Sequence, residues 1–440
     1  MKEVDKVLKI IKEKNVKNIQ LWFTDVLGFL KCVTITDREV ESAFEHGKGF
    51  DGSSITGFAE AEESDILAKP EPETFQLLPW EPVEEPVGRM FCDILNPDGS
   101  PYPGDPRYVL KKVIKEAAEL GFTYYIGPEL EYFYFKSNKE AKGLDEGGYF
   151  DIVPYDLANR LRKKTVKVLE EMGIPVETSH HEVAPSQHEI DLRYQDALTM
   201  ADYTMTYRMV VKEIAQQEGV YATFMPKPVF GVNGSGMHTH QSLFQGTKNA
   251  FFDPNDEHNL SVTAKSFIAG QLKHAREICS ILSQWVNSYK RLVPGYEAPV
   301  YISWAHRNRT ALIRVPMYRP GSEQATRAEL RCPDPACNPY LAFAVMLAAG
   351  LEGIKNKYEL PPPVEPNLYH MEPEEREYRK LKHLPGNLFE ALQETEKSRL
   401  VKETFGEHIF TRFLHNKMKE WDNDRIQVTS HEIDRYLPML

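Results

Sequence analysis

The sequence predicts an α+β fold with a small N-terminal unit and a larger C-terminal unit. The first hundred residues show a strand, strand, helix, strand, strand pattern. The stretch NPDGSPYPGDP (residues 96–106) follows, with four Pro and two Gly in eleven residues, which is typical of a linker. Helical and extended patterns then alternate to the C-terminus. We therefore place the two domains at residues 1–103 and 104–440.

The first elements of the N-terminal unit are a helix and two strands. Apolar residues at helical spacing, with acidic residues among them, predict an amphipathic surface helix over residues 1–17 and not a secretion signal. The stretches IQLWFT (19–24) and FLKCVTI (29–35) are typical of strands. Residues 25–28 (DVLG) between them are predicted to form a turn.

A helix and two more strands complete this unit. Thr36 and Glu39 have the spacing of a capping box at a helix start, and Gly47 is placed to end that helix. The stretches FQLLPW (75–80) and RMFCDIL (89–95) predict the remaining two strands.

The C-terminal unit alternates helices with strands. Residues 107–121 predict an amphipathic helix ended by glycine, and the aromatic-rich residues 122–135 predict a strand. Residues 156–173 predict another helix. The most apolar stretch (340–354) meets a glutamate too soon to span a bilayer, so we expect a buried helix there.

The totals restrict the class of protein. The 440 residues are 41% hydrophobic and 27% charged, which is ordinary for a soluble globular chain. The net charge of −12 argues against a nucleic-acid partner, and an anionic substrate would need local arginine or metal. Five scattered cysteines without CxxC spacing favour reduced thiols in the cytoplasm. We expect no membrane association, because the most apolar stretch is too short to span a bilayer.

The stretch HHEVAPSQHEID (180–191) is half histidine and acidic residues. Because Pro185 excludes a helix, we expect a hairpin-like reversal centred on Pro185 and Ser186. Glu182 and Glu189 are then directly opposite each other on one face. Such a pair requires a cation between the carboxylates, or a proton on one of them.

The same alternation of ionisable residues occurs in other extended stretches. These residues are Glu129 and Glu131; His238, His240 and Ser242; Arg327, Glu329 and Arg331; and Arg307 and Arg309, followed by Arg314. Alone, each set is more often a solvated strand face, surface histidine or salt-bridge arginine. Aromatic residues around the first pair indicate burial, and unpaired buried carboxylates are costly. Together the stretches predict one polar cavity lined by several strands.

The chemistry of this cavity suits hard metal ions. Five carboxylates with one imidazole favour Mg²⁺ or Mn²⁺ over structural zinc, and they suffice for two ions. Two such metals beside clustered arginine are typical of phosphoryl transfer. There is no GxxxxGK[ST], and GVNGSGMH does not match GxGxxG, so neither a P-loop nor a Rossmann turn would bind the nucleotide.

Six stretches in this order carry a family resemblance. They are FDGSS (50–54), GPELEYF (127–133), HHEVAPSQHEID (180–191), KPVFGVNGSGMHTHQS (227–242), RLVPGYEAP (291–299) and RAELRCPDPACNPYLAF (327–343). Over almost the whole chain the sequence resembles bacterial and archaeal type I glutamine synthetase.

The resemblance implies an architecture, an assembly and a reaction. The expected fold is a β-grasp-like N-terminal domain and a catalytic domain with a curved antiparallel sheet and flanking helices. The expected assembly is a dodecamer of two hexameric rings, in which the FDGSS loop is donated to a neighbour's active site. The apolar end of HEIDRYLPML (431–440) fits docking onto the opposite ring or folding on its own subunit. The implied reaction joins ammonia to L-glutamate through γ-glutamyl phosphate, with ATP as co-substrate.

The resemblance also implies roles for single residues. One Mg²⁺ would be held by Glu131, Glu182 and Glu189, and the other by Glu129, His238 and Glu329. The substrate-binding residues would be Tyr149, Asn233, Gly234, His238, Arg291, Arg309 and Arg331. The nucleotide-side residues would be Glu177, Tyr194, His240, Ser242, Arg314 and Arg327. The catalytic residues would be Asp51 as proton acceptor, Glu297 on a flap and Arg309 on the phosphate, with Asp51, Tyr149, Glu182 and Glu297 around ammonium.

Other functions compete with this hypothesis. A related ligase could use a larger amine, although the small polar and anionic walls expected around Asp51, Tyr149 and Glu297 favour ammonium. A two-metal phosphohydrolase would explain the carboxylates but not the arginine set. A non-catalytic ring-forming scaffold would not need the ligand residues. Regulation by glutamine feedback or by adenylylation at Tyr369 stays open.

Overall fold

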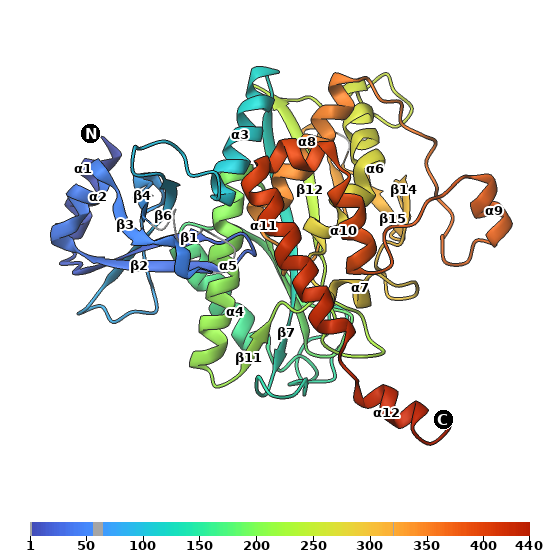
Figure 1. Cartoon of the computed structure of the whole chain (residues 1–440), viewed down its shortest axis with the longest axis horizontal. Coiled ribbons are helices and arrows are strands. Elements are labelled where there is room, and N and C mark those ends of the chain that lie inside the picture. The colour runs from blue at the N-terminus through green and yellow to red at the C-terminus, as the bar shows by residue number, and fades with distance from the viewer. Residues whose placement is uncertain (1, 56–64, 320) are drawn as a thin grey trace.

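The computed structural model describes residues 2–55, 65–319 and 321–440 (Figure 1). The N-terminal domain is built on a mixed sheet in the order β2-β1-β6-β4-β3, with β5 also paired to β6, and β1 and β6 are parallel. Its elements are α1 (Glu3–Glu13), β1 (Asn18–Thr24), β2 (Leu30–Thr36), α2 (Val40–His46), β3 (Lys48–Asp51), β4 (Asp65–Pro70), β5 (Gln76–Leu77) and β6 (Val87–Leu95). This is the expected β-grasp arrangement.

Local physics explains where this domain follows the predictions and where it departs from them. The amphipathic helix is present as α1, which buries Val7 and Ile11. The predicted capping box is wrong, because the side chain of Thr36 caps nothing and a 3₁₀ turn at Asp37–Glu39 precedes α2. Gly47 ends α2 with a φ of 78°, as expected.

Three strands of the domain differ from prediction. The stretch 75–80 forms only the short strand β5. Strands β3 and β4 were not predicted. Strand β3 is four residues long and alternates intermediate with exposed residues, so it lacks the apolar signal of a core strand.

The C-terminal domain is built around a second, larger sheet in the order β14-β15-β16-β12-β7-β9-β8, with β10 and β11 on β7 and β13 on β12. Strands β14 and β15 are parallel, whereas the other described pairs are antiparallel. The strands are β7 (Thr123–Phe135), β8 (Val176–His181), β9 (Gln187–Leu192), β10 (Gln195–Asp196), β11 (Tyr221–Thr223), β12 (Met237–Gln245), β13 (Lys248–Asn249), β14 (Tyr301–Ala305), β15 (Ala311–Arg314) and β16 (Ala328–Leu330).

This domain also contains helices, not all of which lie against the sheet (Figure 1). They are α3 (Pro106–Glu119), α4 (Asn159–Glu171), α5 (Ala197–Gln217), α6 (Val262–Leu282), α7 (Ser288–Arg291), α8 (Pro339–Lys355), α9 (Pro373–Tyr378), α10 (Leu388–Glu396), α11 (Arg399–Arg425) and α12 (Ser430–Tyr436). The predicted buried helix is α8, which packs on α6. A Cβ on Gly353 would lie 2.0 Å from the carbonyl oxygen of Ser266, so the helices touch where only glycine fits. Within the described ranges, no helix has both the length and the apolarity that crossing a bilayer needs.

A buried polar network joins the two domains. Arg107 at the start of α3 forms ion pairs with Asp93 of β6 and, at 3.1 Å, with Asp202 of α5. The hydroxyl of Tyr340 donates to Asp202 at 2.6 Å. Arg208 of α5 donates to the carbonyl of Gly28 in the β1–β2 turn at 2.8 Å. These bonds fix the N-terminal domain against the helices of the C-terminal domain.

Candidate active site

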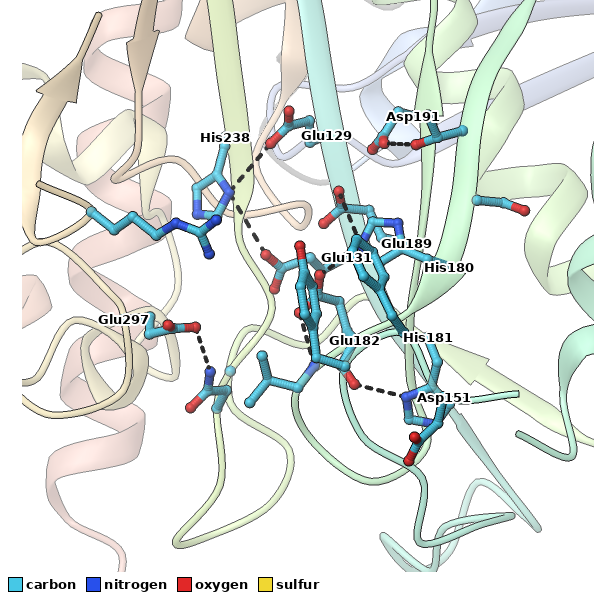
Figure 2. Close-up of a pocket in the computed structure, with 18 of the residues that line it drawn as sticks. Glu129, Glu131, Asp151, His180, His181, Glu182, Glu189, Asp191, His238 and Glu297 are labelled. Atoms are coloured by element: carbon cyan, nitrogen blue, oxygen red, sulfur yellow. Dashed lines mark hydrogen bonds and ion pairs between the residues drawn. The ribbon is translucent and has the colours of Figure 1, made fainter. Parts of the chain in front are cut away.

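Alternate residues of the central strands line one cavity of about 800 Å³ (Figure 2). Strand pairing brings Glu129 opposite both His238 and Asp191, and Glu131 opposite Glu189. The predicted residues that line this cavity are Glu129, Glu131, Tyr149, Glu182, Glu189, Asn233, Gly234, His238, Arg291, Glu297, Arg309, Arg314, Glu329 and Arg331. Residues far apart in the sequence therefore converge as their spacing of two predicts.

A second cavity of about 760 Å³ lies beside the first. The predicted residues that line it are Glu177, Tyr194, His240, Ser242 and Arg327. The two cavities share Glu129, Thr178 and Asp191. The two cavities are therefore adjacent compartments that share a wall at the carboxylates of Glu129 and Asp191.

The hairpin between β8 and β9 has a different register from the predicted one. His180 pairs with Glu189, and the backbone N–H of Glu182 donates to the carbonyl of Gln187. Glu182 and Glu189 are thus diagonal neighbours and are not directly opposite. Since the shift is two residues, their side chains still share one face.

The predicted extended face of Arg307 and Arg309 is also wrong. These residues lie in the turn between β14 and β15. In this turn the backbone N–H groups of His306 and Arg307 donate to the carboxylate of Glu365 and not to a neighbouring strand. Arg309 reaches the first cavity, whereas Arg307 lines a different surface hollow. Two arginines separated by one residue in a turn need not point the same way.

One predicted metal-ligand set is brought together tightly. Ligand atoms of Glu129, His238 and Glu329 all lie within 4.8 Å of one another. Burial and the nearby Arg331 guanidinium lower the pKa of His238 to about 4, so its imidazole is neutral and can ligate. Burial opposes ionisation of Glu329, but Arg331 and the imidazoles hold its pKa below the ordinary value. Two carboxylates and a neutral imidazole fit a divalent cation.

The other predicted metal-ligand set, Glu131, Glu182 and Glu189, brings three carboxyl groups together, and the positive side chains nearby do not fully offset their burial and repulsion. Burial and the neighbouring Glu182 raise the pKa of Glu131 to about 8. Burial and Asp191 raise the pKa of Glu189 well above its ordinary value. The Nε2 atom of His180 lies 2.9 Å from Glu182 and 4.0 Å from Glu189. Buried carboxyl groups that retain protons are suited to exchange them for a divalent cation.

This proton retention predicts a pH-dependent affinity for Mg²⁺. Below a pH of about 8 the Glu131 carboxyl is protonated, and metal must displace that proton. We therefore expect affinity to rise with pH and to level off above about pH 8. Isothermal titration calorimetry with MgCl₂ at about pH 6.5 and about pH 8.5 checks this, and buffers of different ionisation enthalpy report the released protons. Equal affinity at both pH values, without proton release, would contradict the role of Glu131.

Two residues of the site were missed by sequence reasoning. The described residues include a further group, His180, Glu189 and Asp191, whose ligand atoms lie within 4.8 Å of one another. Thr178 also donates a hydrogen bond to Asp191. The signal was present, since His180 and Glu182, and also Glu189 and Asp191, are two residues apart. The two missed residues are His180 and Asp191, which have no predicted role in the sequence analysis.

A third histidine–acidic group has its own structural partners. Asp145, His181 and His188 are all buried beside the cavity. Arg162 can only donate, so its 2.8 Å contact makes Nδ1 of His188 the acceptor and leaves the ring proton on Nε2. His181 contacts Asp145 at 3.0 Å and the carbonyl of Glu182 at 2.7 Å. Each member of this group thus has a protein partner, and His181 supports the backbone beside Glu182.

The arginine and flap residues have well-defined contacts. The guanidinium of Arg291 donates to the carbonyls of Arg331, Cys332 and Pro333 at 2.9–3.1 Å. The amide of Asn233 donates to Glu297 at 3.2 Å across the cavity. Glu297 has a φ of 57°, which is uncommon outside glycine and is frequent where a loop serves a function.

The imidazole of His240 links the two compartments. Arg327 donates to Nδ1 of His240 at 3.1 Å, and therefore Nε2 carries the ring proton. That proton is donated to Glu129 at 2.7 Å. The second compartment is thus connected through one imidazole to the carboxylates of the first.

Asp51 lines neither compartment of its own chain. It lies at the end of β3 in the N-terminal domain, where its carboxylate accepts hydrogen bonds from the Ser53 hydroxyl and backbone N–H at 2.6 and 2.9 Å. These bonds lower the pKa of Asp51. Its side chain is an exposed carboxylate outside its own cavity.

Comparison with known proteins agrees with this geometry. Family models described as "Glutamine synthetase, beta-Grasp domain" and "Glutamine synthetase, catalytic domain" match residues 15–97 and 103–436. A glutamine synthetase of Methanosarcina mazei is 53% identical over 438 residues, covering 99% of this chain and 97% of the relative. One of Mycolicibacterium smegmatis is 52% identical over 439 residues, covering 98% of each.

A solved structure with the same family name has the same fold. A cryo-electron-microscopy structure of Plasmodium falciparum glutamine synthetase has a TM-score of 0.89 at 27% identity, with 98% of each chain covered. The matches span both domains and include every stretch that lines the two compartments. The chain belongs to the glutamine synthetase family.

Proposed function

We propose that the two joined compartments carry out ATP + L-glutamate + ammonia → L-glutamine + ADP + phosphate. Family membership gives the glutamate–ammonia ligase activity, with ATP and a metal required, and favours it over ligation of a larger amine. We place this reaction in the two compartments because they share a border at Glu129 and Asp191. A nucleotide in one compartment and an amino acid in the other would meet there.

We assign two Mg²⁺ ions to the shared border, with Mn²⁺ as a possible substitute. Glu131, Glu182 and Glu189 would hold one ion, and Glu129, His238 and Glu329 the other. The ions would neutralise phosphate oxygens and draw negative groups together. The neutral imidazole of His238 and the proton-retaining carboxyls of Glu131 and Glu189 support this assignment.

The remaining cavity residues would bind and orient the substrates. Arg291, Arg331, Asn233 and Gly234 would hold glutamate, since guanidinium groups pair with carboxylates. Glu177, Tyr194, His240, Ser242 and Arg327 would hold the nucleotide. Arg309 and Arg314 would grip the γ-phosphate while the glutamate γ-carboxylate attacks it, giving γ-glutamyl phosphate. Phosphorylation supplies the leaving group that ammonia then displaces.

The ammonium pocket would be completed by a second copy of the chain. Tyr149, Glu182 and Glu297 lie in the cavity, and the anionic Asp51 of a neighbour would accept the proton from ammonium. The exposed position of Asp51 away from its own cavity supports a shared site. We propose a dodecamer of two hexameric rings. The exposed apolar end at Leu437, Met439 and Leu440 offers a contact between subunits.

Two further assignments remain proposals. We place the domain boundary near residue 103, in the stretch that joins β6 to α3. We place the enzyme in the cytoplasm, supported by free thiols at all five cysteines.

The test is glutamine formation from glutamate, ammonium and Mg·ATP. We expect one phosphate per glutamine and little phosphate without glutamate. Preference for ethylamine or putrescine over ammonium would indicate the larger-amine ligase instead. Phosphate release that needs no glutamate would indicate a phosphohydrolase, and no Mg²⁺-dependent turnover would indicate a scaffold. Added glutamine in the same assay reports feedback.

A further inference from the structure

An extended segment at residues 361–371, which we call the strap, runs from α8 towards α9 along the edge strand β14. The backbone N–H of Val364 donates to Trp304 at 2.8 Å, and the indole N–H of Trp304 donates to Pro361 at 2.6 Å. Val364 also packs with Leu368 and Tyr301 in a small hydrophobic cluster separate from the main core. Figure 1 shows α9 at the margin of the molecule beyond β14. The strap is therefore its own packing unit on this edge of the sheet.

The strap holds the turn that carries Arg309. The carboxylate of Glu365 accepts hydrogen bonds from the backbone N–H groups of His306 at 2.8 Å and Arg307 at 3.1 Å. A carboxylate on two adjacent backbone N–H groups fixes the orientation of the peptide planes between them. Arg309 follows in the same turn and lines the cavity, so the point from which its side chain reaches the site depends on this backbone.

The next residue of the turn is tied to the strap from the other side. The buried amide of Asn308 donates to the carbonyls of Val364 at 3.0 Å and Pro366 at 2.6 Å. Its oxygen accepts from the backbone N–H of Thr310 at 2.9 Å. Arg309 thus lies between Asn308, which is anchored to the strap, and Thr310, which is bonded to Asn308 within the turn.

The same strap also reaches the loop that carries Glu297. The hydroxyl of Tyr369 donates to the carbonyl of Ala298, the residue after Glu297. Ala298 is buried, and the positive φ of Glu297 beside it is a conformation that requires support. The loops that carry Arg309 and Glu297 therefore share one support.

We propose that the strap is a positioning element for catalysis, in which Glu365 orients Arg309 and Tyr369 orients the Glu297 loop. The inference rests on the proposed roles of Arg309 and Glu297. Neither Glu365 nor Tyr369 contacts the substrates in this scheme, and both act through the backbone of the loop they hold. Displacing a charged group by about 1 Å can lower a rate by about 100-fold, so small changes in the strap have measurable effects.

The first experiment compares Glu365→Gln with Glu359→Gln. Glutamine at position 365 presents an amide N–H to one of the two backbone donors and loses that bond. We expect kcat to fall about 10-fold or more, with the KM values for ATP and glutamate changing by less than about 2-fold, because Arg309 acts on the transition state. Glu359 is exposed, and no hydrogen bond or ion pair of its side chain occurs in the described part of the chain, so Glu359→Gln should retain the wild-type kcat.

A double-mutant cycle separates this inference from the proposed function. If Glu365 acts through Arg309, the Glu365→Gln change should add little to Arg309→Ala. Full additivity, or an unchanged kcat for Glu365→Gln beside an impaired Arg309→Ala, overturns the role of Glu365 alone. Wild-type kcat for Arg309→Ala overturns the proposed role of Arg309 and the inference with it. Thermal denaturation of each variant identifies loss of activity through unfolding.

The second arm is Tyr369→Phe, with Tyr221→Phe on β11 as control. Loss of the bond to Ala298 should admit water to the acyl phosphate, so phosphate released per glutamine formed should rise above the wild-type ratio. An unchanged ratio for Tyr369→Phe would overturn the support of the Glu297 loop. This ratio does not depend on how much enzyme is folded, so it separates positioning from stability.

Discussion

Replacing Glu329 with alanine is expected to give the largest loss of activity of any single change in the cavity. Glu329 is fully buried and forms ion pairs with Arg331 and, at 3.0 Å, with Arg314. Alanine removes a proposed metal ligand and leaves two guanidinium groups without their carboxylate. Removing even a hydrogen-bond partner of a metal ligand lowers metal affinity or activity by about 10- to 100-fold. For removal of the proposed ligand itself, we therefore expect kcat to fall by more than about 100-fold.

Two measurements separate loss of the metal from loss of the fold. In a thermal melt, Mg²⁺ should stabilise the wild-type enzyme and stabilise Glu329→Ala much less. Glu329→Gln keeps the volume of the side chain and should lose activity in the same way. Glu119→Ala, an exposed position on α3, is the matched control. Near-normal turnover by Glu329→Ala at ordinary Mg²⁺ concentration would remove Glu329 from the ligand set.

Replacing Asp51 with alanine is expected to impair the use of ammonium specifically. Removing a proton acceptor lowers catalysis by about 10²- to 10⁴-fold, and we expect this loss in kcat/KM for ammonium. Binding of ATP and glutamate should be retained, because Asp51 is not among the residues proposed to hold either of them. Unaltered ammonium kinetics would refute its role as proton acceptor.

Mixing the two variants tests where Asp51 acts. If each site combines Glu329 of one copy with Asp51 of a neighbour, co-assembly of equal amounts of Asp51→Ala and Glu329→Ala subunits should restore about a quarter of the sites. If both residues served the same chain, no hybrid site would be intact. Activity of the reassembled mixture no greater than the sum of the separate variants would exclude a shared site.

The sequence predicted the fold where hydrophobic patterns are strong and failed where they are weak. The buried helix α8 and the aromatic strand β7 have long apolar signals, and both were predicted. Strand β3 offers no such signal, since it is stabilised by pairing with β4 more than by its own burial. The spacing at Thr36 and Glu39 fits a capping box, but the chain makes a 3₁₀ turn there first.

The cavity was predictable because side chains alternate along a strand. That rule survives a register error of two residues, so Glu182 and Glu189 were placed on the correct face with the wrong partners. It fails in turns, and therefore the prediction for Arg307 was wrong. The support given to the Arg309 turn by Glu365 depends on a contact between segments more than fifty residues apart. No local pattern in either segment predicts that contact.

The two compartments that meet at Glu129 and Asp191 also have a consequence for inhibition. If the proposed assignment of the compartments holds, a molecule that fills only the side of Tyr194 and Ser242 would exclude ATP while glutamate could still enter from the other side. Such a molecule would be competitive with one substrate and not with the other, and it could form a dead-end ternary complex. Product inhibition by ADP and by glutamine should accordingly follow different kinetic patterns.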